Sequence, residues 1–383
     1  MKMKKLSLTT CFFLLTLAVG LCLSFGTALT TAAGLLKNFR NFGVTGAVRV
    51  MERTVDEVYS RREDCLAAFG LTQRLLGKKE TRNFEVLKSD DGQLYLSAAD
   101  FPEDEETIRL CAEQIAVLCA ETEAYGGRFL FVQVPYKNAG MASDLQDYTD
   151  DRTEEAEDLL LELLRESRVP TLDLRQDAAC SRFYRTDHHW TVEASYAAAC
   201  DLAAALLPDS GQRERLADPG QYEARCWPDS FLGSIGIKVG PYYTGKDDFT
   251  VLIPTFQTDF SFTILHDGEV VHHSEGPFFD SLVQRELLDD SRYLNKYASM
   301  LFGNTAGYEY ILDNRLAGGD DRVLCITHSY GRSMCAYLSL FSRQTTMLDP
   351  QPGRYEESFL RYIRDHQPDY VVFAYNDLVS IAE

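Results

Sequence analysis

From residue 101 to the C-terminus, short apolar runs alternate with longer amphipathic stretches, and this alternation limits the fold more than any other feature. Residues 128–135 and 322–327 are nearly continuous apolar runs of strand length, whereas residues 108–125 and the alanine-rich residues 191–207 have helical spacing. Strands that are apolar on both faces and are joined by helices form a parallel sheet covered on both sides. We therefore predict a three-layer α/β/α fold. Further strands are predicted at 171–174, 345–348 and 369–375, and further helices at 154–168, 333–342 and 355–365.

The alternation is interrupted over about residues 208–320, which are rich in glycine and contain a different pattern. Two runs with strand character, 260–264 and 269–273, flank the dipeptide Asp267-Gly268. Because Asp-Gly favours a two-residue hairpin turn, these runs predict a β-hairpin. We expect residues 208–320 to be an insertion that packs beside the sheet, within a domain that spans residues 101–383.

The N-terminus carries a topological signal. Three lysines lie among the first five residues, and no charged residue follows from 6 to 36. A cleavable signal peptide has an apolar core of only about 7–15 residues, whereas a membrane-spanning helix needs about 20. Residues 1–36 are therefore predicted to be a signal anchor, with cleavage as a signal peptide left open by small residues near the end of the stretch. The main domain would lie outside the cytoplasm, either anchored by a single span through residues 6–36 or secreted.

Between this segment and the main domain, residues 37–100 are predicted to form a juxtamembrane helical segment. Helical apolar spacing extends from 48 to 76, and a short strand is expected at 92–96 after an Asp-Asp-Gly turn.

Charge and cysteine content exclude some functions. The formal net charge of −20 argues against nucleic acid as a partner, because binding of phosphate groups requires clustered lysine and arginine. The ten cysteines are scattered and include no Cys-x-x-Cys pair, so no metal cluster is predicted and no cofactor is implied.

A serine stands where the apolar run 322–327 ends. The sequence continues His328-Ser329-Tyr330-Gly331 and then becomes helical. A serine at this position lies at the carboxyl edge of a parallel sheet, where such folds bind ligands. The N-terminus of the following helix supplies free N–H groups and partial positive charge for an oxyanion. The sequence therefore indicates Ser329 as a nucleophile, with simple capping of the helix as the alternative.

The second chemical signal is Asp187-His188-His189-Trp190, which precedes the helix at 191–207. A serine hydroxyl needs an imidazole to take its proton, and that imidazole needs a carboxylate to fix its tautomer. Asp187 and His189, two residues apart on an extended loop, can pair as the orienting carboxylate and the base. His188 is the competing base, and the adjacent histidines leave a metal site as a further alternative.

The segment Asp187-His188-His189-Trp190-Thr191 resembles the signature of the DHHW family. That family is similar to the SGNH-hydrolase-like domains of bacterial exopolysaccharide O-acetyltransferases, including those of alginate. The resemblance covers roughly residues 50–383. The serine motif departs from the common Gly-Asp-Ser-x, because the run here is Thr327-His328-Ser329-Tyr330.

The resemblance implies a chain order and an oxyanion hole. SGNH enzymes usually place the serine before the Asp/His pair, so this domain looks circularly permuted, with the strands at 322–327, 345–348 and 369–375 as the early ones. The segment ending in Ala374-Tyr375-Asn376-Asp377 is similar to the family's Gly-x-Asn-Asp. Asn376 and the N–H of Ser329 are then expected to form the oxyanion hole. Possible supporting residues are His188, Tyr330, and a second glycine donor, either Gly353 or Gly233.

The function that the resemblance implies is O-acetylation of a cell-surface or secreted polysaccharide through an acyl-Ser329 intermediate. A membrane O-acyltransferase would supply the acyl group. Two alternatives stay open. One is an esterase or deacetylase that uses the same site, and the other is an inactive glycan-binding or scaffold module of an envelope complex.

Overall fold

The computed structural model describes residues 62–97, 104–141, 143–148, 152–207, 213–290, 295–305, 307–351, 354–355 and 357–375. The predicted N-terminal anchor and the first part of the juxtamembrane segment lie outside these residues. Within the described part of the chain, no helix combines the length and the apolar character that a membrane span requires.

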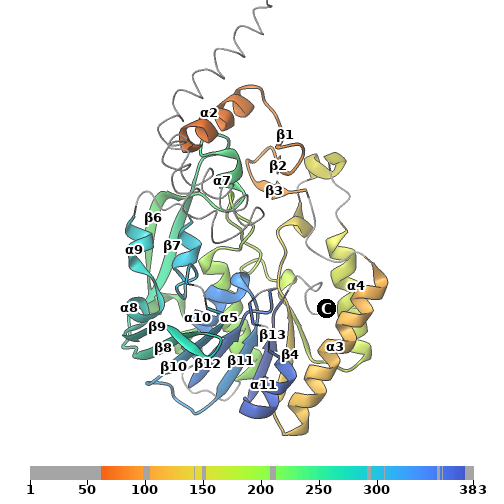
Figure 1. Cartoon of the computed structure of the whole chain (residues 1–383), viewed down its shortest axis with the longest axis vertical. Coiled ribbons are helices and arrows are strands. Elements are labelled where there is room, and N and C mark those ends of the chain that lie inside the picture. Colours follow the sequence, from red (N-terminus) through yellow and green to blue (C-terminus); the bar gives the residue numbers. More distant parts are fainter. Residues whose placement is uncertain are drawn as a thin grey trace, which may run out of the picture.

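An eight-stranded mixed sheet forms the core of the molecule (Figure 1). Its strands are β4 (Arg128–Gln133), β5 (Thr171–Asp173), β8 (Phe260–His266), β9 (Glu269–Gly276), β10 (Glu309–Asn314), β11 (Arg322–Ile326), β12 (Gln344–Leu348) and β13 (Tyr370–Phe373). The spatial order is β5-β4-β13-β11-β12-β10-β8-β9. Neighbours from β5 to β12 are parallel, and the pairings from β12 to β9 are antiparallel.

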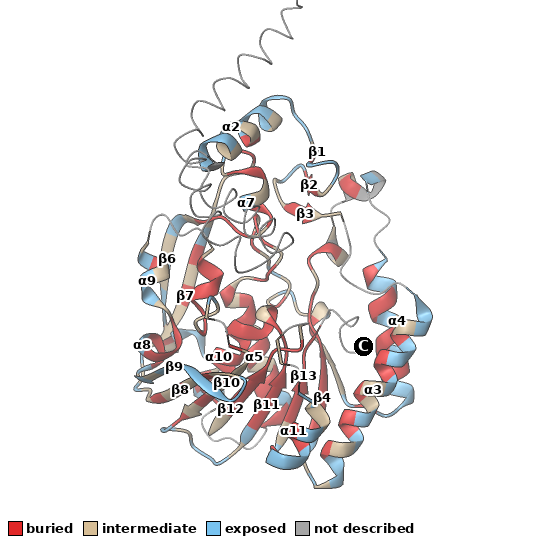
Figure 2. Cartoon of the chain, viewed as in Figure 1, coloured by how far each residue is buried: buried red, intermediate tan, exposed pale blue. Residues whose placement is uncertain are grey.

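Helices cover both faces of the sheet, so the predicted three-layer α/β/α arrangement is confirmed for the described residues. The α-helices are α2 (Arg62–Leu75), α3 (Glu105–Ala124), α4 (Thr153–Glu166), α5 (Val192–Leu206), α6 (Arg213–Leu216), α7 (Gly236–Val239), α8 (Phe278–Leu282), α9 (Arg285–Asp289), α10 (Arg332–Leu338) and α11 (Phe359–His366). Helices α5 and α10 pack on one face, and α3, α4 and α11 pack on the other. Within β4, Leu130 and Val132 join the first of these cores, and Phe129 and Phe131 the second. This division explains why the central strands read as continuous apolar runs, and Figure 2 shows them buried.

The segment 208–320 differs from the expectation that it would only pack beside the sheet. The strands β8, β9 and β10 extend the main sheet, because β10 pairs antiparallel with β12. The expected hairpin joins β8 to β9, and Asp267 and Gly268 have φ values of 50° and 76°, as a type I′ turn requires. The strands β6 (Tyr222–Phe231) and β7 (Asp247–Pro254) form a separate two-stranded ribbon.

A small sheet precedes the main one and contains β1 (Glu80–Thr81), β2 (Val86–Lys88) and β3 (Leu94–Leu96). The strand expected at 92–96 is therefore present as β3. Val86 and Leu94 pack against Ile235 and Val239 at α7, so this sheet is joined to the segment that follows β6. The connection brings residues around 94 and around 235 to the same end of the molecule as the carboxyl ends of the parallel strands (Figure 1).

Candidate active site

Ser329 lies in a tight turn between β11 and α10, here called the nucleophile turn (residues 327–331). The turn contains the single-turn 3₁₀ helix Ser329–Gly331, and Gly331 N–H donates to the carbonyl of His328 at 3.1 Å. A Cβ on Gly331 would lie 2.2 Å from Thr327 Oγ1, so any larger residue here would have to displace the Thr327 side chain. Thr327 Oγ1 in turn donates to the carbonyl of Ala374, beyond β13, at 2.5 Å. The half-buried Ser329 is thus held at the carboxyl edge of the sheet, as the sequence predicts.

The residues on either side of Ser329 make hydrogen bonds that hold the nucleophile turn in place. His328 has an extended backbone, and its Nδ1 accepts from Tyr330 N–H at 3.4 Å. Tyr330, predicted as a supporting residue, is buried, and its hydroxyl donates to the carbonyl of Pro135 at 2.6 Å. Its carbonyl accepts from Trp190 Nε1 at 2.9 Å. Tyr330 therefore supports the site by joining the nucleophile turn to β4 and to Trp190.

The second half of the site is an irregular loop, here called the base loop (residues 183–190), which an isolated bridge between Phe183 and Trp190 closes. Thr191 follows it as the N-cap of α5 and accepts from Ala194 N–H at 3.2 Å. The fully buried Trp190 fixes the end of the loop in the core.

Segments that are distant in sequence hold the base loop from several sides. Asp247, at the start of β7, accepts from Arg185 N–H at 2.9 Å and from Thr186 N–H at 2.8 Å. Leu94 N–H donates to the carbonyl of Arg185 at 2.9 Å, and Gly236 N–H donates to the carbonyl of Thr186 at 2.8 Å. The β3 strand and the 208–320 segment thus shape the loop.

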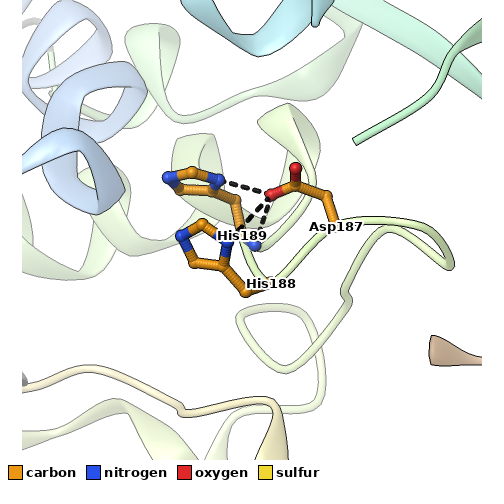
Figure 3. Close-up of side chains that lie close together, drawn as sticks. All are labelled: Asp187, His188 and His189. Carbon is orange, nitrogen blue, oxygen red and sulfur yellow. Dashed lines mark hydrogen bonds and ion pairs between the residues drawn. The ribbon is translucent and has the colours of Figure 1, made fainter. Parts of the chain in front are cut away.

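Asp187, His189 and Ser329 come together as a chain of hydrogen bonds. His189 Nε2 lies 3.1 Å from Ser329 Oγ, and His189 Nδ1 lies 2.5 Å from Asp187 Oδ1. The same carboxylate oxygen accepts from His189 N–H at 2.8 Å. In Figure 3, Asp187 faces the Nδ1 side of the His189 ring and leaves the other nitrogen directed away from it. This geometry is that of a nucleophile, a base and an orienting carboxylate.

The carboxylate of Asp187 is fully buried but stays ionised. Burial alone would raise its pKa, but His189, His188 and the hydrogen bonds that the carboxylate accepts hold the pKa well below its usual range. Ser234 N–H, at 2.5 Å from Oδ2, is one of these donors. An ionised carboxylate here can stabilise the imidazolium that forms when His189 takes a proton.

His188 occupies a different position from His189. Its Nδ1 lies 2.7 Å from Ser234 Oγ and 3.6 Å from Asp187 Oδ1, and its ring lies 3.9 Å from that of His189. Burial and the neighbouring His189 lower the pKa of His188, although 40% of its side chain is exposed. Because His189 is the described residue that contacts both the carboxylate and the serine, the geometry favours His189 as the base.

The donor set at Asp187, His188 and His189 does not favour a metal. Their potential ligand atoms lie within 4.8 Å of one another. Both oxygens of Asp187, however, already accept hydrogen bonds from N–H groups, and His189 Nδ1 faces Asp187 as a proton donor. A nitrogen that carries a proton cannot also be a metal ligand.

The predicted oxyanion groups are only partly described. Ser329 N–H makes no hydrogen bond to another described residue and lies at the start of the 3₁₀ helix Ser329–Gly331. Gly233 N–H donates to Thr186 Oγ1 at 2.9 Å, so it is not available as the second glycine donor. A Cβ on Gly233 would lie 2.2 Å from that of Asp187, which gives this glycine a packing role instead. Asn376 and Gly353 lie outside the described residues, and their roles stay predictions.

Tyr297 and Lys137 are two of the residues at the site that were not found from the sequence. The ring of Tyr297 stacks on His189 at 4.1 Å, and its hydroxyl donates to the carbonyl of Tyr330 at 3.0 Å. Lys137 is buried behind the base loop, and its ammonium donates to three carbonyls of that loop. The sequence signal for Lys137 was its position shortly after an apolar strand. No local pattern marks Tyr297.

A cavity of about 670 Å³ adjoins the base loop, and Lys137 and Phe183 form part of its wall. The remaining wall is mainly polar and includes Gln93, Arg175 and Arg182. Ligand cavities typically measure about 300–1,000 Å³, so this one is large enough for a small ligand.

Comparison with known proteins agrees with the fold and with the resemblance noted above. The family model "SGNH hydrolase-like domain, acetyltransferase AlgX" matches residues 86–229, which include Asp187 and His189. The structure of Bacillus cereus PatB1 with a sulfonyl adduct is similar, with 18% identity, a TM-score of 0.61, and coverage of 77% of this chain and 94% of that one. A DHHW family protein from Eubacterium siraeum has 14% identity, a TM-score of 0.58, and coverage of 78% and 95%. No curated protein sequence matches the chain.

Proposed function

We propose that this chain is an acyltransferase that moves an acetyl group to a hydroxyl of an extracytoplasmic polysaccharide through an acyl-Ser329 intermediate. The observation that carries the proposal is the contact of 3.1 Å between His189 Nε2 and Ser329 Oγ, combined with the contact between His189 Nδ1 and the buried Asp187. A serine activated in this way forms and breaks esters.

In the first half-reaction, His189 Nε2 takes the proton of Ser329 as Oγ attacks the carbonyl carbon of the donor ester. The electron pair of the C=O bond moves to oxygen, and Ser329 N–H together with the predicted Asn376 side chain stabilises that charge. One such donor typically lowers the barrier by about 2.7–4 kcal/mol. The tetrahedral intermediate then breaks its bond to the leaving alcohol, which takes the proton from His189.

In the second half-reaction, His189 removes the proton of an acceptor hydroxyl, and the acceptor oxygen attacks the acyl-Ser329 carbon. Collapse of this intermediate transfers the acyl group and returns the proton to Ser329 Oγ. With water as the acceptor the same steps give hydrolysis, so the bound acceptor decides between a transferase and an esterase. The family match over residues 86–229 supports transfer.

The strand order supports the proposed circular permutation. When the C-terminal strands β11, β12 and β13 are counted before β4 and β5, the parallel part of the sheet has the order 2-1-3-4-5. This is a common order for doubly wound sheets. In a permuted domain the serine follows the first strand of that order, and the Asp/His pair lies near its end.

Location and partners are also part of the proposal. The uncharged residues 6–36 would anchor the domain on the outer side of the membrane. A membrane O-acyltransferase would deliver the acyl group there. The polar cavity beside the base loop is a candidate for binding part of the acceptor chain.

The test uses the full chain with an activated acetyl ester, with and without oligosaccharides, and measures product masses. Acetylated oligosaccharide would support transfer, and release of acetate alone in every mixture would support the esterase alternative. Ser329→Ala should abolish both products. Ser230→Ala is the matched control, because the Ser230 hydroxyl donates to the carbonyl of Trp227 outside the triad.

A serine-reactive fluorophosphonate tests the third alternative. If the full chain binds a glycan but Ser329 is not labelled and no acyl product forms, the chain is a binding module and the proposed mechanism is wrong. Labelling that Ser329→Ala removes would support the mechanism.

A further inference from the structure

We infer that Lys137 is a positioning residue that sets the backbone of the base loop by donating to three of its carbonyls at once. The inference concerns the geometry of Asp187 and His189, and its catalytic readout rests on the proposed function.

The contacts of Lys137 match the donor capacity of a protonated lysine. Its Nζ lies 2.7 Å from the carbonyl oxygen of Tyr184, 2.9 Å from that of Asp187 and 3.2 Å from that of Arg185. An ammonium has three N–H donors in a compact, roughly tetrahedral arrangement. A neutral amine has only two, and the guanidinium of arginine holds its donors in a rigid planar fork that differs from this tetrahedral arrangement.

The position of Lys137 is itself fixed by the fold. It lies four residues beyond the end of β4, the strand that pairs with β5 and β13, and only 3% of its surface is exposed. The next residue, Asn138, donates through Nδ2 to the carbonyl of Leu96 at 2.8 Å. The ammonium lies 5.2 Å from the centre of the Tyr95 ring, a favourable cation–π contact. One side chain thereby joins three carbonyls of the base loop to the segment that follows β4.

Titratable groups face the ammonium from three elements. Asp187 and His188 lie on the base loop, Asp247 at the start of β7, and Asp91 in the turn before β3. Burial lowers the pKa of Lys137 to about 7, and the three carboxylates oppose that shift. When the ammonium loses its proton, one of the three carbonyls loses its donor. We therefore expect the geometry of the base loop to weaken as pH rises through about 7.

The first experiment measures kcat and KM for hydrolysis of an activated acetyl ester as a function of pH. The full chain should show a decline at alkaline pH that reports Lys137. Lys137→Met should lower kcat by about 10–100-fold, in line with the cost of a small misplacement of reacting groups. Its KM should change less than threefold, and its pH profile should lack the alkaline decline. Lys137→Arg should also lack the decline and should stay below the full chain in kcat. An alkaline decline that persists unchanged in Lys137→Met would overturn the inference.

Asn314→Leu is the matched structural control. Asn314 is also a buried residue whose side chain donates to backbone carbonyls, those of Ser339 and Leu340, at 3.1 and 3.3 Å. It should lose stability comparably while keeping the pH profile. If both variants lose kcat equally at every pH, Lys137 has only a structural role.

A second readout does not depend on any acyl transfer. The Nδ1 proton of a histidine that is strongly hydrogen-bonded to a carboxylate resonates far downfield in proton NMR spectra. This signal should be present in the unsubstituted chain and in Asn314→Leu, and lost or shifted in Lys137→Met. If the chain proves inactive but the signal behaves in this way, the inference survives while the proposed function fails. A signal that is unchanged in Lys137→Met contradicts the inference.

Discussion

The nucleophile turn and the base loop both position catalytic side chains at the same site, but different kinds of contact hold them there. The nucleophile turn joins β11 directly to α10, and it is completed by neighbours in regular structure, such as the contact of Thr327 with the carbonyl of Ala374 at the end of β13. The base loop contains no helix or regular strand. Its contacts come from Leu94, Lys137, Gly236 and Asp247, which lie on separate segments.

The two halves of the site are therefore positioned by different kinds of contact. The position of Ser329 follows from the sheet, which the apolar core stabilises as a whole. The positions of Asp187 and His189 depend on individual hydrogen bonds to an irregular backbone, and each of these can be removed by one substitution. We therefore expect supporting substitutions around the base loop to impair activity more than comparable substitutions around the nucleophile turn.

The largest effect on kcat should come from removing the negative charge of Asp187 in the base loop. Asp187→Asn keeps the shape but removes the charge that stabilises imidazolium, and the corresponding change in a serine protease triad costs about 10⁴-fold in kcat. We expect a loss of that order in ester hydrolysis, measured at saturating substrate. Because triad residues act as a unit, Asp187→Asn combined with Ser329→Ala should be no slower than Ser329→Ala alone. Nearly wild-type kcat in Asp187→Asn would remove the carboxylate from the mechanism.

The next test compares one glycine from each region. A Cβ on Gly233 would lie 2.2 Å from Asp187 Cβ and 2.7 Å from its Cα, whereas one on Gly331 meets the side chain of Thr327. The backbone of Asp187 cannot turn away, so Gly233→Ala should lower kcat by about 10²-fold. Gly331→Ala should mainly destabilise the fold, by about 1–3 kcal/mol. Kinetics and urea unfolding measure the two effects.

Gly319→Ala is the control for that pair, since its Cβ would meet only Asp321 Oδ2, at 3.3 Å. If Gly331→Ala loses more activity than Gly233→Ala, the proposed contrast between the two regions is wrong.

The same contrast explains what could be predicted from the sequence. The layers, the strand before Ser329 and the helix at 191–207 follow from local periodicity, and these predictions agree with the structure. The Asp187-His189 pair could be recognised as a motif. The contacts of Lys137 and Asp247 join the base loop to residues about 50 to 62 positions away, in segments without periodicity, so no local pattern reveals them.

A smaller effect is expected when an outer support of the base loop is changed. Asp247 accepts from Arg185 N–H through Oδ1, and from Thr186 N–H and Oγ1 through Oδ2. Asp247→Asn replaces one acceptor by a donor that faces an N–H group. We expect a loss of about 1–3 kcal/mol in unfolding free energy and a fall in kcat of about tenfold. Hydrogen exchange at the amides of residues 185 and 186 should accelerate.

Thr327→Val is the counterpart in the nucleophile turn. It removes the hydrogen bond to the carbonyl of Ala374 and should cost about 1 kcal/mol, with kcat changed only a few-fold. Equal kinetic losses in the two variants would contradict the contrast.

The smallest effect concerns Tyr297, the residue that contacts both regions. Its ring stacks on His189 at 4.1 Å, while its hydroxyl donates to the carbonyl of Tyr330 at 3.0 Å. Tyr297→Phe keeps the stack and removes the hydrogen bond, so we expect a loss of about 1 kcal/mol in stability and a change in kcat of less than about threefold. Tyr297→Leu removes the aromatic stack as well, and because the ring of His189 would then lose its flat support, kcat should fall further, by about tenfold. If the kcat of Tyr297→Phe is as low as that of Tyr297→Leu, the hydroxyl contributes more to kcat than the stacked ring does. The two regions are then coupled through the hydrogen bond to the carbonyl of Tyr330 and not through the stacking of Tyr297 on His189.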